Sequence, residues 1–150
     1  LVPQEIYLRD ASISDNISFA YGRNETSNLE DVIEASKVAC AYDFIRRLPN
    51  FFDEIVGENG ARLSGGEKQR IGIAREIYRR SQIYIFDEAT SAIDFSTEKR
   101  IISNILQSLS GSTIIMIAHR MSTLRHCNKI YEVKNGTVTL VDKSNLNFSK

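Results

Sequence analysis

Apolar side chains recur at a spacing of about 3.6 residues in three long stretches of the chain, which predicts three helices. The first stretch opens on Ser27-Asn28-Leu29-Glu30, a capping-box pattern, and Pro49 is expected to close the helix. The second helix is expected from about Gly66 to Arg80 and the third over residues 96–109. Their apolar faces would contain Leu29, Val32, Ile33, Ala39, Tyr42, Ile45 and Leu48, then Ile73, Ala74 and Ile77, then Ile101, Ile102, Ile105, Leu106 and Leu109.

Two short apolar runs predict strands of a parallel sheet. Ile83-Tyr84-Ile85-Phe86 suits a central strand that is buried on both faces, and Thr113 to Ile117 predicts a second buried strand. A short helix is expected near residues 121–126. Asn135-Gly136 separates two further runs, Lys129 to Val133 and Thr137 to Val141, and is a strong signal for a β-hairpin.

The remaining segments are polar or rich in glycine. Leu1 to Gln4 would be the tail of a strand, while residues 5–27 contain scattered turn formers and are expected to be irregular. Residues 57–66 hold four of the eight glycines and predict a loop. Residues 142–150 are expected to fray. Strands that alternate with helices predict an α/β fold with a mostly parallel sheet.

Composition and charge exclude several classes of protein. Nineteen basic residues balance nineteen acidic ones, so no net field favours nucleic acid or an anionic membrane. The longest strongly apolar stretch, Ile114 to Ala118, is far shorter than the roughly 20 residues that span a bilayer. The chain opens without a leader pattern or an initiator Met, which suggests a piece of a longer protein. Cys40 and Cys127 are expected to be reduced, and His119 and His126 lack the spacing of zinc ligands.

Two adjacent carboxylates follow the first predicted strand. Ligands of open α/β sheets bind beyond the carboxyl ends of the strands. Asp87 could therefore hold Mg²⁺, and Glu88 could accept a proton from an attacking water. By themselves these residues could equally be a solvated strand end.

The segment Leu63-Ser64-Gly65-Gly66-Glu67-Lys68-Gln69-Arg70 could bind an anion. The glycines let a ligand approach the backbone, the following helix offers unpaired N–H groups, and Ser64 adds a hydroxyl. Ser64 and Glu67 also have the spacing of a capping box, which is the more ordinary interpretation of this pattern.

Three further residues are candidates for the same chemistry. His119 follows the second predicted strand and could donate a hydrogen bond to phosphate, although a lone His is more often structural. A single Gln4 is almost unspecific. Asp94, in Ser91-Ala92-Ile93-Asp94, could simply cap the next helix.

Taken in order, these segments resemble the nucleotide-binding domain of ABC transporters over residues 1–141. The resemblance implies a P-loop NTPase (ABC ATPase) fold that is only partly present, with ATP and Mg²⁺ as ligands. It implies that Gln4 is the Q-loop glutamine on Mg²⁺ or the attacking water, Asp87 the Walker B aspartate and Glu88 the general base. His119 would contact the γ-phosphate of ATP.

The same resemblance implies roles for the other segments. The signature loop, Ser64, Gly65 and Gly66 with Glu67, would grip ATP held by an opposite subunit, and Asp94 would lie at that dimer interface. Residues 1–27 would hold the Q-loop and the start of a helical subdomain, which residues 28–80 would complete. Residues 81–141 would form the C-terminal part of the catalytic core, followed by a polar tail over 142–150.

The partners implied are a second nucleotide-binding domain, head to tail, and the transmembrane domains. Residues 56–60 resemble the segment with which exporters touch the intracellular ends of those domains, and the surface between Gln4 and Asn16 would dock there too. An exporter at the cytoplasmic face of a membrane is therefore expected, with the fragment itself soluble. The alternative is a head domain of chromosome-maintenance or DNA-repair ATPases, but those place a long coiled coil between the Q-loop and the signature. Gln4 and Ser64 are only sixty positions apart.

The phosphate loop of the family, G-x-x-x-x-G-K-[ST], does not occur in these residues. Truncation is the expected reason, and the isolated chain is expected to be inactive. Loss of the strand that carries this loop should leave an exposed sheet edge. That edge would pack against another copy, exchange elements or leave part of the sheet disordered.

Overall fold

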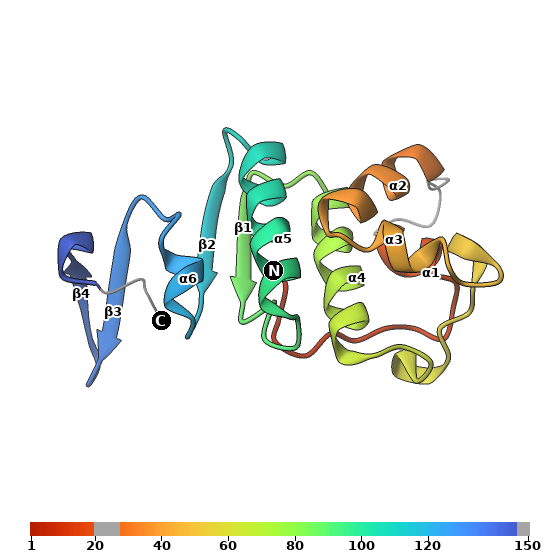
Figure 1. The fold of residues 1–150 in the computed structure, drawn as a ribbon, viewed down its shortest axis with the longest axis horizontal. Helices are drawn as coiled ribbons and strands as arrows, with labels where there is room; N and C mark the ends of the chain where they lie inside the picture. Colours follow the sequence, from red (N-terminus) through yellow and green to blue (C-terminus); the bar gives the residue numbers. More distant parts are fainter. Residues whose placement is uncertain (20–27, 147–150) are drawn as a thin grey trace.

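The computed structural model describes residues 1–19 and 28–146, which form a row of layers (Figure 1). A small sheet of β1 (Ile83–Asp87) and β2 (Thr113–Ile117) lies near the centre, with α5 (Phe95–Ser108) over β1. Helix α4 (Gly65–Tyr78) lies next to α5, and smaller helices pack beyond it. A hairpin of β3 (Ile130–Lys134) and β4 (Thr137–Val141) lies at the opposite end, beyond α6 (Met121–Leu124).

Strand β1 is paired on both sides. It runs parallel to β2, with Ile83 opposite Thr113 and Asp87 opposite Ile117. On its other edge the backbone N–H of Val2 donates to Ile85 at 2.8 Å, and the N–H of Asp87 donates to Val2 at 2.9 Å. This arrangement confirms the parallel pairing, and Val2 forms the strand-like tail expected near the start of the chain.

The predicted burial of these strands was partly wrong. Tyr84 and Phe86 on one face of β1 are buried, but Ile83 is exposed. Along β2, Ile115 and Ile117 are 47% and 49% exposed, while Ile114 and Met116 pack against the core. Within the described residues the outer face of β2 is about half exposed, and no strand pairs with its second edge. An apolar run predicts a strand, but only its neighbours decide how much of it is buried. The exposed edge agrees with the expected one, and what packs there stays a prediction.

The hairpin has the predicted turn. Asn135 and Gly136 have φ of 51° and 75°, the pair of positive values that a type I′ turn requires. Residues 143–145 then form one turn of 3₁₀ helix in the tail predicted to fray, and residues 147–150 of that tail lie outside the described part.

The two long helices begin and end within two residues of the predictions, because their caps are local. Ser64 and Glu67 form the complete capping box of α4. Asp94 caps α5 by accepting a hydrogen bond from the backbone N–H of Thr97 at 3.0 Å. The loop before α4 contains two single turns of 3₁₀ helix, residues 51–53 and 58–60.

The first predicted helix is two helices, α2 (Leu29–Val38) and α3 (Tyr42–Ile45). Cys40 has a φ of 53°, its N–H donates to Lys37, and the N–H of Ala41 donates to Ser36. This is the Schellman ending, in which the left-handed residue is normally glycine, so a cysteine there gave no signal. Asn28 caps α2, because its Oδ1 accepts from the N–H of Glu30 at 3.0 Å. Ser27, the first residue of the predicted capping box, lies outside the described residues, and Leu29 is exposed rather than on the apolar face.

Residues 13–18 form helix α1 (Ile13–Ser18), where an irregular segment was predicted. Ser12 caps the helix by accepting from the N–H of Asp15 at 3.0 Å, and Ile13 and Ile17 are fully buried. The buried amide of Asn16 then bonds the backbone of Arg9 in both directions, at 2.9 and 3.0 Å. The available signal for this helix was the cap Ser12 followed by Ile13 and Ile17, two apolar residues four positions apart. The many polar residues around them favoured the prediction of an irregular segment instead. The last part of the segment predicted to be irregular, residues 20–27, lies outside the described part.

Candidate functional site

Glu88 lies where β1 ends, in a backbone conformation that is unusual for its type. Its φ of 46° is in the left-handed region, and its N–H donates to the carbonyl of Ile117, the last residue of β2. Such a conformation is strained for a residue other than glycine and costs free energy of folding, and positions of this kind cluster at functional sites. The ends of both parallel strands are therefore joined at Glu88.

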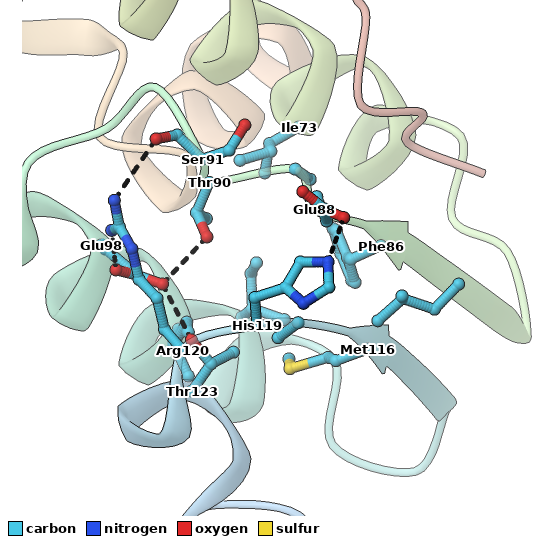
Figure 2. Close-up of a pocket in the computed structure, with 15 residues that line it drawn as sticks. Ile73, Phe86, Glu88, Thr90, Ser91, Glu98, Met116, His119, Arg120 and Thr123 are labelled. Carbon is cyan, nitrogen blue, oxygen red and sulfur yellow. Dashed lines mark hydrogen bonds and ion pairs between the residues drawn. The ribbon is translucent and has the colours of Figure 1, made fainter. Parts of the chain in front are cut away.

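Gln4, Glu88 and His119 meet at this point, although they are far apart in the sequence. The side-chain amide Nε2 of Gln4 donates to Glu88 Oε2 at 3.2 Å, and His119 Nε2 lies 2.8 Å from Glu88 Oε1. Figure 2 shows the imidazole pointing to the carboxylate. His119 is 84% exposed, so packing does little to hold it. Three of the predicted site residues thus form one cluster with an amide, a carboxylate and an imidazole in contact.

A cavity of about 120 Å³ lies beside this cluster. Apolar side chains such as Ile73, Phe86 and Met116 line it, with Glu88 and His119 among its polar residues (Figure 2). Pockets that enclose ligands of drug size are typically about 300–1,000 Å³. This cavity is too small to enclose a nucleotide, so any nucleotide at Glu88 would lie on the surface.

Asp87 could take part in a magnesium site. Its carboxylate is half-buried and, within the described part of the chain, has no hydrogen-bond or ion-pair partner. Gln4 uses its amide nitrogen on Glu88, which leaves its oxygen available. Carboxylate and amide oxygens are hard donors that suit Mg²⁺, which usually takes only one or two protein carboxylates and fills its shell with water and phosphate. These two side chains therefore fit such an ion. No group of three or more His, Cys, Asp or Glu that could hold a metal occurs in residues 1–19 and 28–146.

The Ser64 segment forms a second cluster, at a shallow depression of about 360 Å³. The capping box uses the hydroxyl predicted to bind phosphate, because Ser64 Oγ accepts from the N–H of Glu67 at 3.4 Å. The same hydroxyl also donates to Glu67 Oε2 at 2.7 Å. The depression contains no residue of the Glu88 cluster. It is lined by Ser64, Gly65, Gly66, Arg70, Ala92, Ile93 and Asp94.

Asp94 brings a fixed negative charge to this depression. The side chains of Ser96 and Thr97 hydrogen-bond its carboxylate, which lowers the pKa of Asp94 far below its ordinary value. Arg70 brings a positive charge that the sequence prediction did not single out. Its guanidinium donates to the carbonyl of Cys40 at 3.0 Å and lies over the ring of Phe44, and burial lowers the pKa of Arg70.

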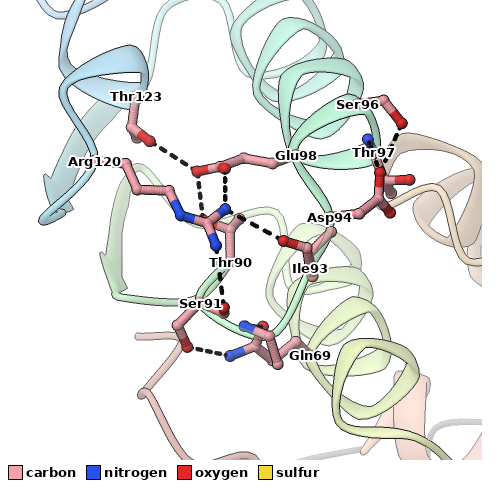
Figure 3. A network of polar contacts seen from close by, with 11 residues as sticks. Gln69, Thr90, Ser91, Ile93, Asp94, Ser96, Thr97, Glu98, Arg120 and Thr123 are labelled. Carbon is pink, nitrogen blue, oxygen red and sulfur yellow. Dashed lines mark hydrogen bonds and ion pairs between the residues drawn. The ribbon is translucent and has the colours of Figure 1, made fainter. Parts of the chain in front are cut away.

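The loop over residues 89–94 lies against both clusters. A Cβ added to Gly66 would lie 2.9 Å from the carbonyl oxygen of Ala92, so the start of α4 and this loop are in backbone contact. On its other side the loop contacts Arg120, the residue after His119. The guanidinium of Arg120 pairs with the buried Glu98 (Figure 3). Glu98 was not predicted. The signal was a carboxylate in the apolar stripe of α5, where Ile101, Ile102 and Ile105 follow at helical spacing.

Neither cysteine is in a disulfide, and burial raises the pKa of both thiols. Each described helix is too short or too polar to cross a bilayer.

Comparison with known proteins gives consistent matches. The family model described as "ABC transporter" matches residues 2–91. The ATP-dependent lipid A-core flippase of Haemophilus influenzae (strain 86-028NP) is 41% identical over 138 residues, 92% of this chain and 23% of the flippase. The alpha-hemolysin translocation ATP-binding protein HlyB of Escherichia coli O157:H7 is 44% identical over 139 residues, 93% of this chain and 19% of HlyB.

A solved structure agrees with these relatives. The structure of a bacterial Atm1-family ABC exporter with ATP bound has a TM-score of 0.82 at 41% identity, and the match covers 90% of this chain and 23% of that one. The chain thus spans about a fifth of the length of the curated relatives that it matches.

Proposed function

Because this chain belongs to the ABC transporter family and has part of its P-loop ATPase fold, we propose that it is part of an exporter's ATP-binding and ATP-hydrolysing domain. The observation that carries the proposal is the contact of Gln4, Glu88 and His119 at the ends of two parallel strands. The relatives, a lipid flippase, a hemolysin translocation protein and an Atm1-family exporter, favour an exporter, and no observation favours the DNA-repair alternative.

Glu88 is the proposed general base. Water attacks the γ-phosphorus of ATP, the bond to the β–γ bridging oxygen breaks, and Glu88 accepts the proton that the water loses. Gln4 holds one carboxylate oxygen and would orient the water, while the imidazole of His119 would donate to the γ-phosphate. Asp87 and the amide oxygen of Gln4 would hold Mg²⁺, which stabilises negative charge on the phosphates when it is bound.

The second cluster is proposed to serve ATP held by another subunit. Ser64, Gly65 and Gly66 lie at the N-terminus of a 14-residue helix, where backbone N–H groups and the helix dipole favour an anion. The Ser64 hydroxyl would leave Glu67 and turn to the phosphate, with Asp94 at the same interface. The depression and the cavity beside Glu88 share no lining residue, so one domain would offer the two clusters at separate places. In a head-to-tail pair, the Glu88 cluster of one domain and the depression of the other would contact the same nucleotide.

The surroundings follow from the same proposal. The domain would work at the cytoplasmic face of a membrane, docked to transmembrane domains through the surface near residues 4–16 and 56–60. The 150 residues alone would not hydrolyse ATP, since the phosphate loop that the family uses is not among them.

The proposal is tested in the full-length protein with Glu88→Gln. The variant should keep binding radiolabelled ATP while phosphate release falls by about 10²–10⁴-fold, the usual contribution of a positioned base. Glu132→Gln, the same change at an exposed position of β3, is the matched control and should behave as the unaltered protein. Phosphate release by Glu88→Gln within twofold of the control would refute the assignment.

A further inference from the structure

The carboxylate of Glu98 is fully paired in the core. Glu98 is 3% exposed, on a helix face that is otherwise apolar. Its Oε1 accepts from the hydroxyls of Thr90 at 2.9 Å and Thr123 at 2.8 Å, and Oε2 accepts from Arg120. A buried charge is tolerated only with such complete pairing. Glu98 thereby joins three segments: the loop after β1, the residue next to His119, and α6.

Arg120 extends this pairing to the loop over residues 89–94. Its Nη1 donates to the carbonyl of Ile93 at 3.2 Å and its Nη2 to the carbonyl of Ser91 at 3.3 Å. Figure 3 shows the guanidinium between Glu98 and this loop. Only a planar group with several donors can make all these bonds at once.

Gln69 holds the same loop from the other side. Gln69 is 5% exposed and lies on α4, three residues after Gly66. Its Nε2 donates to Ser91 Oγ at 2.9 Å, and its Oε1 accepts from the N–H of Ala92 at 2.9 Å. The loop is therefore held between Gln69, three residues after Gly66, and Arg120, the residue after His119.

We propose that Glu98, Arg120 and Gln69 are positioning residues that set His119 against Glu88. His119 is largely exposed, so its place depends on the backbone beside it, and Arg120 fixes that backbone to the clamped loop. A change at Gly66 or Asp94, where another subunit would engage, reaches His119 through the same loop. This inference rests on the proposed function and adds to it a physical route between the two clusters.

Two substitutions test the route in the full-length protein. Arg120→Lys keeps a positive charge for Glu98 but cannot also reach both carbonyls, and Gln69→Met keeps the length of the side chain without its hydrogen bonds. Each should lower kcat for ATP at least tenfold, leave KM within about threefold, and reduce the Hill coefficient for ATP toward 1. Arg100→Lys is the control, because Arg100 lies on α5, the helix of Glu98, and forms an exposed ion pair with Asp43 at 3.8 Å.

The outcomes separate a positioning role from a structural one. Variants that melt at lower temperature but keep wild-type kcat and Hill coefficient would overturn the proposal, as would strictly additive losses in the double variant. If the double variant Arg120→Lys/Gln69→Met has a kcat no lower than that of the less active single variant, a shared route is supported. Failure of the proposed function would look different: the unaltered protein would release no phosphate, or Glu88→Gln would have no effect.

Discussion

Gly72 lies where helix α4 is packed most tightly against the start of the chain. A Cβ added there would lie 2.5, 2.9 and 3.0 Å from the Cδ1, Cγ1 and Cγ2 atoms of Ile6, which is itself buried. Three atoms of one β-branched side chain cannot all rotate away, because its χ1 angle is stiff. Gly72→Ala therefore forces Ile6 and its backbone to move as a unit.

The expected cost can be worked out from two opposing terms. Alanine favours a helix interior over glycine by about 1 kcal/mol. Overpacking of a core costs about 1–3 kcal/mol, and three contacts at or below 3.0 Å indicate the upper end. The net loss should be about 2 kcal/mol, which corresponds to a roughly 30-fold higher population of the locally opened state.

Hydrogen exchange followed by mass spectrometry in the full-length protein measures this loss. Peptides from α4 and from residues 5–8 should exchange about 30-fold faster in Gly72→Ala. Adding Ile6→Ala should remove the extra loss, because the smaller side chain makes room for the new methyl group. Gly65→Ala is the matched control, since its Cβ would meet only the Cβ of Ala92, at an ordinary 3.4 Å. Unchanged or slower exchange in Gly72→Ala, or additivity with Ile6→Ala, would refute the reasoning.

Three other expectations concern separate parts of the chain. Gly136→Ala should destabilise the hairpin by about 1–2 kcal/mol, seen as faster exchange over residues 130–141, because alanine would have to adopt the left-handed conformation with no steric contact to add to the cost; unchanged protection would contradict this. Cys40 is buried and its pKa is raised, so native protein at pH 8 should be alkylated by iodoacetamide far more slowly than unfolded protein, as mass spectrometry of the modified peptide will report. The pKa of Asp94 is lowered in the folded protein, so its ionised form stabilises the fold above the ordinary value of 3.8 and this contribution is lost as the pH falls below it. The difference in melting temperature between wild type and Asp94→Asn should therefore shrink between about pH 5 and pH 2, and a constant difference would count against the assigned hydrogen bonds.

Local signals account for the parts of the fold that could be predicted. The capping box of Ser64 and Glu67, the Asp94 cap and the Asn135-Gly136 turn each specify their structure within a few residues. The break at Cys40 could not be predicted in the same way, because a cysteine occupies a left-handed position that usually needs glycine.

The exposed face of β2 could not be predicted, because it depends on which segments the fold places beside that strand. The pairing of Glu98 could not be predicted either, because its partners Arg120 and Thr123 are 22 and 25 residues away in the sequence. The site shows the same division. The places of Glu88 and His119 after two strands could be predicted, whereas the contacts of Glu88 with Gln4 and with His119 needed the fold.

Position 88 also records a compromise between folding and chemistry. With φ at 46°, glycine or asparagine would be accommodated there more easily than glutamate, so selection for stability alone would not keep Glu88. Screens that reward only expression or heat resistance should enrich the smaller residues at this position, and the proteins they select should be robust and catalytically silent. If Glu88 has the proposed role, the backbone angle marks a position where thermostabilisation and turnover would pull the sequence in opposite directions.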